Sequence, residues 1–155
     1  MTDDVVKTQL EKLREQFGDE IYTKTKWEGR QADWLIQWFA KFTNNTNFQV
    51  PMTFTVGGNL VTGMLISETE YFEQLASSFA SGLPEENRES AKKMIKALQP
   101  LSSPGEDDGL ASQFVHLLNA NVFTSASKPI VNGGVLWRGK ISSIEGFHLG
   151  SLSVS

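Results

Sequence analysis

Few residues in this 155-residue chain have the type and spacing for acid–base or metal chemistry. There are two histidines, His116 and His148, and no cysteine. His116 stands between Val115 and Leu117 in an apolar alternation, which predicts a sheet-face histidine with a backbone or solvent partner. Neither histidine belongs to an H-x-x-H or H-E-x-x-H pattern, in which two imidazoles on one helix face hold zinc. The absence of cysteine removes thiol nucleophiles, disulfides and thiolate ligands.

Two further features resemble functional motifs. Glu68, Glu70 and Glu73 lie on adjacent turns of a predicted helix, where they could approach a substrate. The favourable interaction of carboxylates with a helix start explains them more simply. Gly57-Gly58 precedes a strand rather than a helix, so the pair predicts a hairpin and not a phosphate-binding loop. We therefore predict no catalytic, metal-binding or cofactor-binding residue, and a protein that is not an enzyme.

The charge and hydrophobicity of the chain limit the classes of partner that it can bind. The formal net charge is −4, and residues 111–155 carry only Lys128, Arg138 and Lys140 against Glu145. This balance is poorly suited to general binding of phosphate backbones. No apolar run approaches the roughly 20 residues that span a bilayer, and the N-terminus lacks the pattern of a signal peptide. We expect a cytoplasmic protein, no membrane contact and no nucleic-acid partner.

The first predicted element is an amphipathic helix over residues 3–18. Val6, Leu10, Leu13 and Phe17 recur at spacings of 4, 3 and 4, which places them in one stripe, and Gly18 is suited to end the helix. A helix this short is marginal alone in water, so the stripe needs a partner surface. We assign residues 1–29 to this helix and its connection, and residues 30–155 to one domain.

A second helix is predicted over residues 31–43. Its apolar positions form a broad aromatic face: Trp34, Leu35, Trp38, Phe39 and Phe42. Two interpretations stay open. The aromatic side chains cover one face of a sheet, or part of the face packs on another subunit.

The apolar period then changes from helical to alternating, which predicts two strands joined at Gly57-Gly58. Pro51 has no N–H for a ladder, so we expect the first strand to lie at a sheet edge there. Gly63 within the return strand, 60–66, predicts a bulge or sharp bend.

A helical insertion of about residues 68–98 follows, opened by a Ser67–Glu70 capping box. Residues 99–109 form a predicted acidic loop. Three more strands are expected at 114–123, 135–144 and 147–154. The predicted fold is therefore α+β, with a small antiparallel sheet of about five strands in the form of an Sm-like or SH3-like barrel.

Two segments resemble the Sm family. "GGNLVTGMLISETEYF" is similar to the first Sm motif, and "VLWRGKISSI" is similar to the second. Of the RNA-holding residues that the resemblance implies, only Arg138 has a matching place, because the acid and amide of the first motif are missing. The resemblance keeps a nucleic-acid-binding or general protein-interaction module as the alternative function.

Residues 31–153 resemble the gas vesicle accessory proteins of the GvpU family more closely. The most specific part is "WRGKISSIEGFHLG", residues 137–150. The resemblance implies a non-enzymatic cytoplasmic protein that self-associates into homo-oligomers. It also implies binding to the gas vesicle surface or to other gas vesicle proteins, and an influence on vesicle clustering or assembly. Residues 1–28 extend beyond the usual family start.

We expect interaction through two sets of residues. One is the N-terminal stripe, and the other lies in the last two strands. The complete set is Val6, Leu10, Leu13, Phe17, Trp137, Arg138 and Phe147. The terminal segment should close the sheet, with Gly139 permitting a bend and Arg138 making an ion pair or a subunit contact.

Overall fold

The computed structural model describes residues 32–102, 111–125, 128–130 and 133–152, together with Glu15 and Gly18. The predicted helix over 3–18 and its connection therefore lie outside the described residues, except for those two positions. Most of the predicted acidic loop lies outside them as well.

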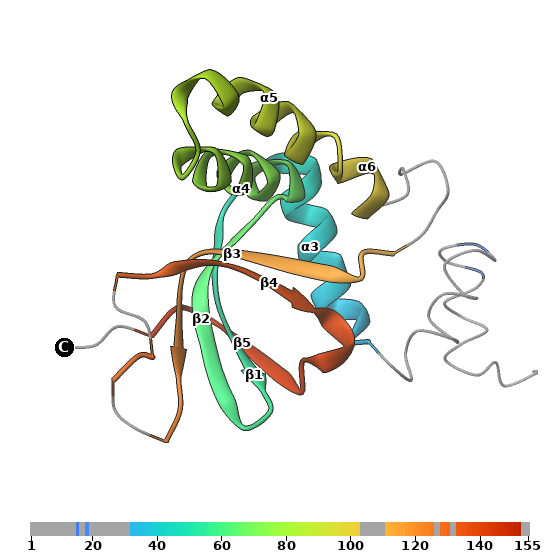
Figure 1. Cartoon of the computed structure of the whole chain (residues 1–155). Coiled ribbons are helices and arrows are strands. Elements are labelled where there is room, and N and C mark those ends of the chain that lie inside the picture. Colours follow the sequence, from blue (N-terminus) through green and yellow to red (C-terminus); the bar gives the residue numbers. More distant parts are fainter. Residues whose placement is uncertain are drawn as a thin grey trace, which may run out of the picture.

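The helices and the antiparallel strands form an α+β fold, which confirms the predicted class (Figure 1). In chain order they are α3 (Trp34–Thr46), β1 (Val50–Val56), β2 (Asn59–Ile66), α4 (Glu68–Ser81), α5 (Glu85–Lys96), α6 (Gln99–Ser102), β3 (Phe114–Phe123), β4 (Val135–Lys140), the 3-10 turn η2 (Ile141–Ser143) and β5 (Gly146–Leu149). Several boundaries differ from prediction. Residues 99–102 form a helical turn rather than loop, and the fourth strand ends at Lys140, directly before η2. The helix predicted over 31–43 begins and ends three residues later, and the strand predicted over 147–154 already ends at Leu149.

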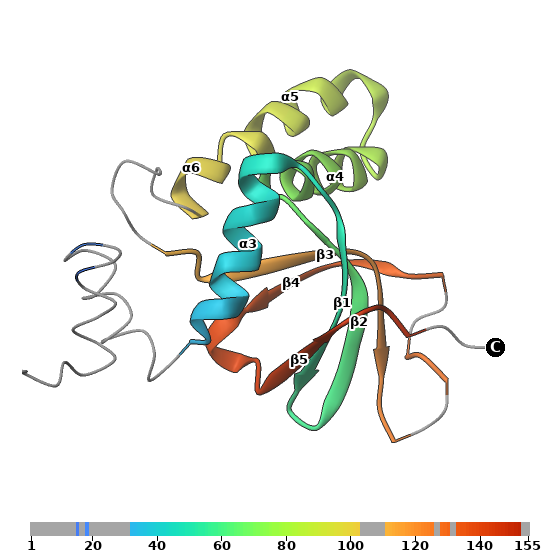
Figure 2. The ribbon, with the colours of Figure 1, turned by 180° about the vertical axis from the view of Figure 1, so that it is seen from behind.

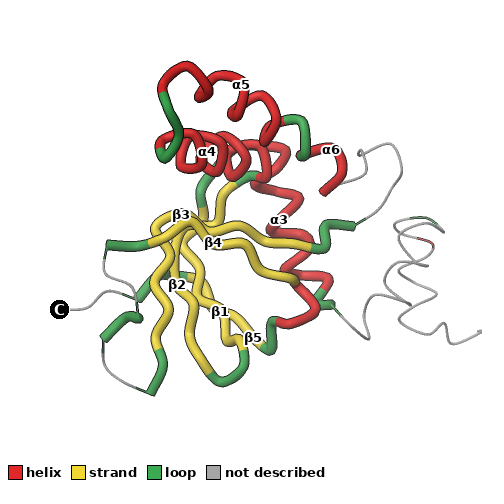
Figure 3. The backbone as a smooth tube through the Cα atoms, viewed as in Figure 1, coloured by secondary structure: helices red, strands yellow, loops and turns green. Residues whose placement is uncertain are grey.

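The five strands, yellow in Figure 3, form one sheet in the order β4-β3-β2-β1-β5, and the register shows that all neighbours are antiparallel. The expectation of a barrel is corrected by this order, because the sheet that the described residues form is open. Closure would need a ladder between β4 and β5. The chain instead turns through η2, and the four residues of β5 pair with Met52–Thr55 of β1.

The β1–β2 hairpin and its bulge follow the glycines. Gly57 and Gly58 adopt φ values of 58° and 79°, which confirms the predicted tight turn. The predicted irregularity at Gly63 is also confirmed, because the β2–β3 register shifts between Thr62 and Met64. A Cβ atom at Gly63 would lie 2.9 Å from the carbonyl oxygen of Leu118, so only glycine fits this close approach.

The expectation that β1 lies at a sheet edge at Pro51 holds only locally. β1 is flanked by β2 on one side and by β5 on the other, but the β5 ladder covers only Met52–Thr55 and stops before Pro51. Pro51 needs no N–H at this place, because it lies where the β5 ladder ends and its carbonyl accepts a 2.7 Å hydrogen bond from Gly150 N. The terminal segment then crosses toward β2, where Leu152 N donates to Thr62 Oγ1 at 2.8 Å. The segment therefore adds an edge strand rather than closing the sheet.

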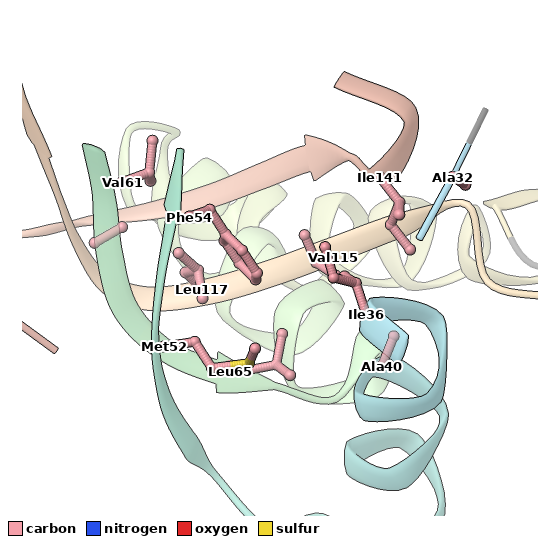
Figure 4. Packing of buried hydrophobic residues seen from close by; sticks show 11 residues of the cluster. Ala32, Ile36, Ala40, Met52, Phe54, Val61, Leu65, Val115, Leu117 and Ile141 are labelled. Atoms are coloured by element: carbon pink, nitrogen blue, oxygen red, sulfur yellow. The ribbon is translucent and has the colours of Figure 1, made fainter. Parts of the chain in front are cut away.

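Helices cover both faces of the sheet. The α4–α5 hairpin lies above the strands in Figure 1, and α3 crosses the other side in the reversed view of Figure 2. The main core lies between α3 and the sheet (Figure 4) and contains Ala32, Ile36, Ala40, Met52, Phe54, Val61, Leu65, Val115, Leu117, Ala120 and Ile141. A second cluster joins Ile66 to Tyr71 and Phe72 of α4 on the opposite face.

Candidate interaction surface

α3 buries a face made of one isoleucine and of small or polar side chains. Its buried residues are Ile36, Gln37, Ala40 and Thr43. Gln37 Nε2 donates to the Ser112 carbonyl at 3.1 Å, and Thr43 Oγ1 donates to the Ala40 carbonyl at 2.9 Å, so the polar members of this face are satisfied. Small side chains at this face let the helix approach the sheet closely.

The largest side chains of α3 therefore point the other way. Trp34 is 59% exposed and Trp38 is 52% exposed. The interpretation that the aromatic face covers the sheet is wrong for these two residues. It holds in part for Phe39, which packs against the main core.

Four aromatic residues define what we call the aromatic strip: the exposed Trp34, Trp38 and Phe48 and the half-buried Phe42. Trp38 and Phe42 stack with centroids 5.5 Å apart and planes at 12°. Phe42 and Phe48 follow at 5.9 Å. Asn47 makes this possible, because its left-handed backbone, φ 59°, ends α3 and reverses the chain. Phe48 thus returns beside the helix.

The aromatic strip is connected to the edge strand β5. Trp38 contacts the ring of Phe39 edge-on at 5.1 Å, and Phe39 contacts Phe147 at 6.0 Å. Leu149 shares the sheet face of Phe147, because the two residues lie opposite Met52 and Phe54 in the register. Leu149 is exposed as well. The apolar surface therefore runs from α3 towards one open edge of the sheet.

The size of this surface can be compared with the apolar patches of other proteins. With about 200 Å² for a large aromatic side chain, the exposed fractions of Trp34 (59%), Trp38 (52%) and Phe48 (64%) leave roughly 350 Å² uncovered. The largest contiguous apolar patch on a typical monomer is about 300–600 Å² and is often functional. The aromatic strip falls within that range.

Arg138 lies on the opposite face of the sheet. Its Nη1 is 2.9 Å from Nε2 of His116, and its guanidinium carbon is 3.8 Å from the ring centroid of Phe114. The rings of Tyr71 and Phe72 lie 5.9 Å from the same carbon. Because these rings belong to α4, Arg138 fastens the helical insertion to β3 and β4. The Arg138 that matches the second Sm motif thus packs within the fold.

His116 is neutral in this cluster. A guanidinium has no acceptor, so Nε2 of His116 must accept the hydrogen bond. Burial, with a smaller contribution from the Arg138 charge, lowers the pKa of His116 to about 3. The prediction that His116 has a backbone or solvent partner is therefore wrong. Arg138 and the Tyr71 ring, 4.4 Å away, take that place.

Alternation along β4 explains the Trp-Arg-Gly triplet. Trp137 points toward α3 and stacks on Phe54 at 6.3 Å, while Arg138 points toward α4. The ring of Trp137 lies over Gly139, where any Cβ would clash with it. The sequence predicted that Gly139 permits a bend. The structure shows that it makes room for the tryptophan.

The structure locates three of the seven predicted interaction residues. Trp137 and Phe147 pack partly buried against the main core, and Arg138 lies in the α4 cluster. The four residues of the N-terminal stripe lie outside the described residues. Sequence reasoning missed the exposure of Trp34 and Trp38. The sequence did contain a signal for this exposure. Ile36 and Ala40 have a helical spacing of their own and lie on the opposite side of α3 from the tryptophans, so that side could also face the sheet.

Within the described residues, no group of three or more His, Asp or Glu side chains is arranged to hold a metal ion. None of the helices in that part of the chain combines the length and apolar character needed to cross a membrane.

Comparison with known proteins assigns the family. The family model described as "Gas vesicle protein GvpU-like" matches residues 33–152, from the start of α3 to just beyond β5. The chain belongs to the GvpU-like family. This confirms the resemblance carried by residues 137–150. No curated protein and no solved structure matches the chain. The match contains both the aromatic strip and the Arg138 cluster of this GvpU-like protein.

Proposed function

We propose that this GvpU-like protein is a non-enzymatic, cytoplasmic accessory protein that self-associates, binds gas vesicles and influences their clustering or assembly. Family membership supports an association with gas vesicle components. The observation that carries self-association is the aromatic strip, where two tryptophans remain more than half exposed on an ordered helix. A protein that both contacts a vesicle and binds its own copies can link two vesicles.

Two further surfaces contribute to the proposed contacts. One is the N-terminal stripe of Val6, Leu10, Leu13 and Phe17. The other is formed by the edge strands, β4 with Trp137 and Arg138, and β5 with Phe147. Edge strands present unpaired backbone N–H and C=O groups that a partner can use. The partner is the gas vesicle surface or another gas vesicle protein, together with further copies of this chain.

The polar clusters of the described residues support a non-enzymatic role. Arg138 and His116 lie among aromatic rings and join α4 to the sheet. In the described part of the chain, each buried side-chain nitrogen or oxygen has a hydrogen-bond partner. These groups are thus used in the fold.

Flotation tests the vesicle contact. Purified protein is mixed with isolated gas vesicles, the vesicles are floated by centrifugation, and the floating layer is assayed for the protein over a range of salt concentrations. We expect the protein in the floating layer, and clusters in the light microscope. An unrelated soluble protein of similar size controls for trapping. Protein that stays below the vesicles at every salt concentration would refute the proposal.

A further inference from the structure

We propose that the aromatic strip binds a second copy of this chain, α3 against α3 in antiparallel orientation about a two-fold axis near Trp38. This inference rests on the proposed self-association and names the surface and the partner. It uses only residues that the structure describes.

The first argument is the composition of α3. A helix with large apolar side chains on two opposite sides normally buries both sides. One side of α3 packs on the sheet through Ile36 and Ala40, and the other carries Trp34 and Trp38. Tryptophan is enriched in protein interfaces, where large aromatic side chains act as anchors. The exposed side of α3 is thus suited to a protein partner.

The second argument is self-complementarity. In an antiparallel pair centred on Trp38, positions four residues before and after the centre face each other. Trp34 of each copy then meets Phe42 of the other, and the two Trp38 side chains meet at the axis. Aromatic pairs of this kind add to the gain from apolar burial. A two-fold contact uses the same surface on both copies, as most homodimers do.

The third argument is charge. Asp33 and Lys41 are both exposed and lie along the chain on either side of Trp34 and Trp38. In an antiparallel pair centred on Trp38, two positions face each other when their residue numbers sum to 76. The numbers of Asp33 and Lys41 sum to 74, so each Lys41 lies near Asp33 of the second copy. The mismatch of two residues is about 3 Å along a helix. A parallel arrangement would instead bring like charges together, so charge favours the antiparallel one.

The area that the two copies bury limits how tightly they bind. Two copies of a roughly 350 Å² strip bury about 700 Å² of apolar surface, below the roughly 1,200 Å² of stable interfaces. We therefore expect a weak, concentration-dependent dimer. Such a contact also lets a few added contacts or a crowded vesicle surface control assembly.

The first test removes the anchors. Analytical ultracentrifugation over a concentration series compares the wild type with Trp34→Ser/Trp38→Ser. We expect the double variant to dimerise at least about tenfold more weakly, because truncated aromatic anchors are commonly interface hot spots. Phe79→Ser is the matched control, since Phe79 is 53% exposed but lies on α4. It should leave dimerisation unchanged. Circular dichroism confirms that all variants are folded.

The second test addresses orientation. Lys41→Glu and Asp33→Lys should each dimerise several-fold more weakly than the wild type, because each places two pairs of like charges across the axis. An equimolar mixture of the two should regain affinity, since the charges are again opposite. Lys93→Glu, an equal charge change on α5, is the control. Asp33 also caps α3, because its carboxylate accepts a hydrogen bond from Leu35 N. The mixture contains the same Asp33→Lys chain, so comparing it with that variant alone separates the effect of charge from the loss of the cap.

The outcomes separate the proposals. A wild type that stays monomeric at every concentration refutes self-association, and this inference with it. A wild type that associates equally well after the tryptophan changes refutes only the α3 contact. Association that needs the tryptophans but shows no rescue in the charge mixture overturns the α3–α3 pairing. It would assign the aromatic strip to another segment of the chain, such as the N-terminal stripe.

Discussion

At His116, burial decides which protonation state the folded protein accepts. The imidazole is held neutral between the Arg138 guanidinium and the Tyr71 ring, and its pKa is lowered from 6.5 to about 3, mainly by burial. Protonation would place a second cation beside Arg138 in a site with little water. The unfolded chain, in contrast, takes up this proton readily below pH 6.5.

This difference predicts an acid-sensitive fold. The unfolded state binds more protons than the folded state between pH 6.5 and about 3, so the free energy of unfolding is highest above pH 6.5 and falls as the pH drops. At pH 5 the loss from this one group is about 2 kcal/mol. Urea denaturation at pH 7 and pH 5 measures it. His116→Gln should have a lower free energy of unfolding than the wild type at pH 7. Its loss of stability between pH 7 and pH 5 should be about 2 kcal/mol smaller than that of the wild type.

His148 supplies the control for this measurement. It is exposed, and its Nδ1 lies beside the Leu149 carbonyl at 3.0 Å. His148→Gln should preserve the wild-type dependence on pH. An equal loss of stability between pH 7 and pH 5 in His116→Gln and the wild type would show that His116 is not the responsible group.

Gly139 gives a second prediction about a single residue. Gly139→Ala places a Cβ where the Trp137 ring lies, so the ring must shift from its place on Phe54. We expect a loss of about 1–3 kcal/mol in the free energy of unfolding, as for other overpacked cores. Gly146→Ala is the control, because no heavy atom lies within 4 Å of its added Cβ. Equal stability of the two variants would contradict this account of the Trp-Arg-Gly triplet.

Among the elements, α4 depends on its N-cap. Ser67 is buried and its Oγ accepts a 3.1 Å hydrogen bond from Glu70 N. Ser67→Ala should therefore destabilise the protein by about 1 kcal/mol. Ser77→Ala, on the exposed side of the same helix, should be neutral or slightly stabilising, because alanine has the higher helix propensity. Thermal unfolding compares the two, and a larger loss for Ser77→Ala would contradict the capping role.

Local rules predicted the elements but not how they face each other. The Gly57-Gly58 turn and the Ser67 cap depend on backbone geometry within a few residues, and both were predictable. The place of β1 in the sheet depends on β5, almost a hundred residues later, so the sequence predicted an edge at Pro51 but not the strand that flanks the rest of β1. The direction of α3 also escaped prediction. Its apolar residues occupy both sides, and hydrophobicity alone does not say whether Ile36 or Trp38 faces the sheet.

At the scale of the whole molecule, the sequence predicted the α+β class and the family but not the open sheet. A sheet of five antiparallel strands is compatible with a closed barrel and with an open layer. The choice depends on whether the two end strands pair, and alternation along a strand does not encode this. The candidate site was predictable only in part for a similar reason. The tryptophans were recognised as a possible subunit contact, but their exposure follows from the packing of the opposite side of α3 on β2 and β3.

The last prediction concerns how the parts combine in assembly. A helix of about 16 residues is marginal alone in water, so the stripe of Val6, Leu10, Leu13 and Phe17 needs a surface. The aromatic strip alone supplies too little area for a stable dimer, and the N-terminal stripe would add to it. Leu10→Asp/Leu13→Asp should therefore shift the species to smaller mass in light scattering, while circular dichroism of the sheet persists. Thr8→Asp/Gln16→Asp adds equal charge outside the stripe and should preserve the mass. An unchanged mass in the leucine variant would show that the predicted helix over 3–18 is not an assembly element, and would leave self-association to α3.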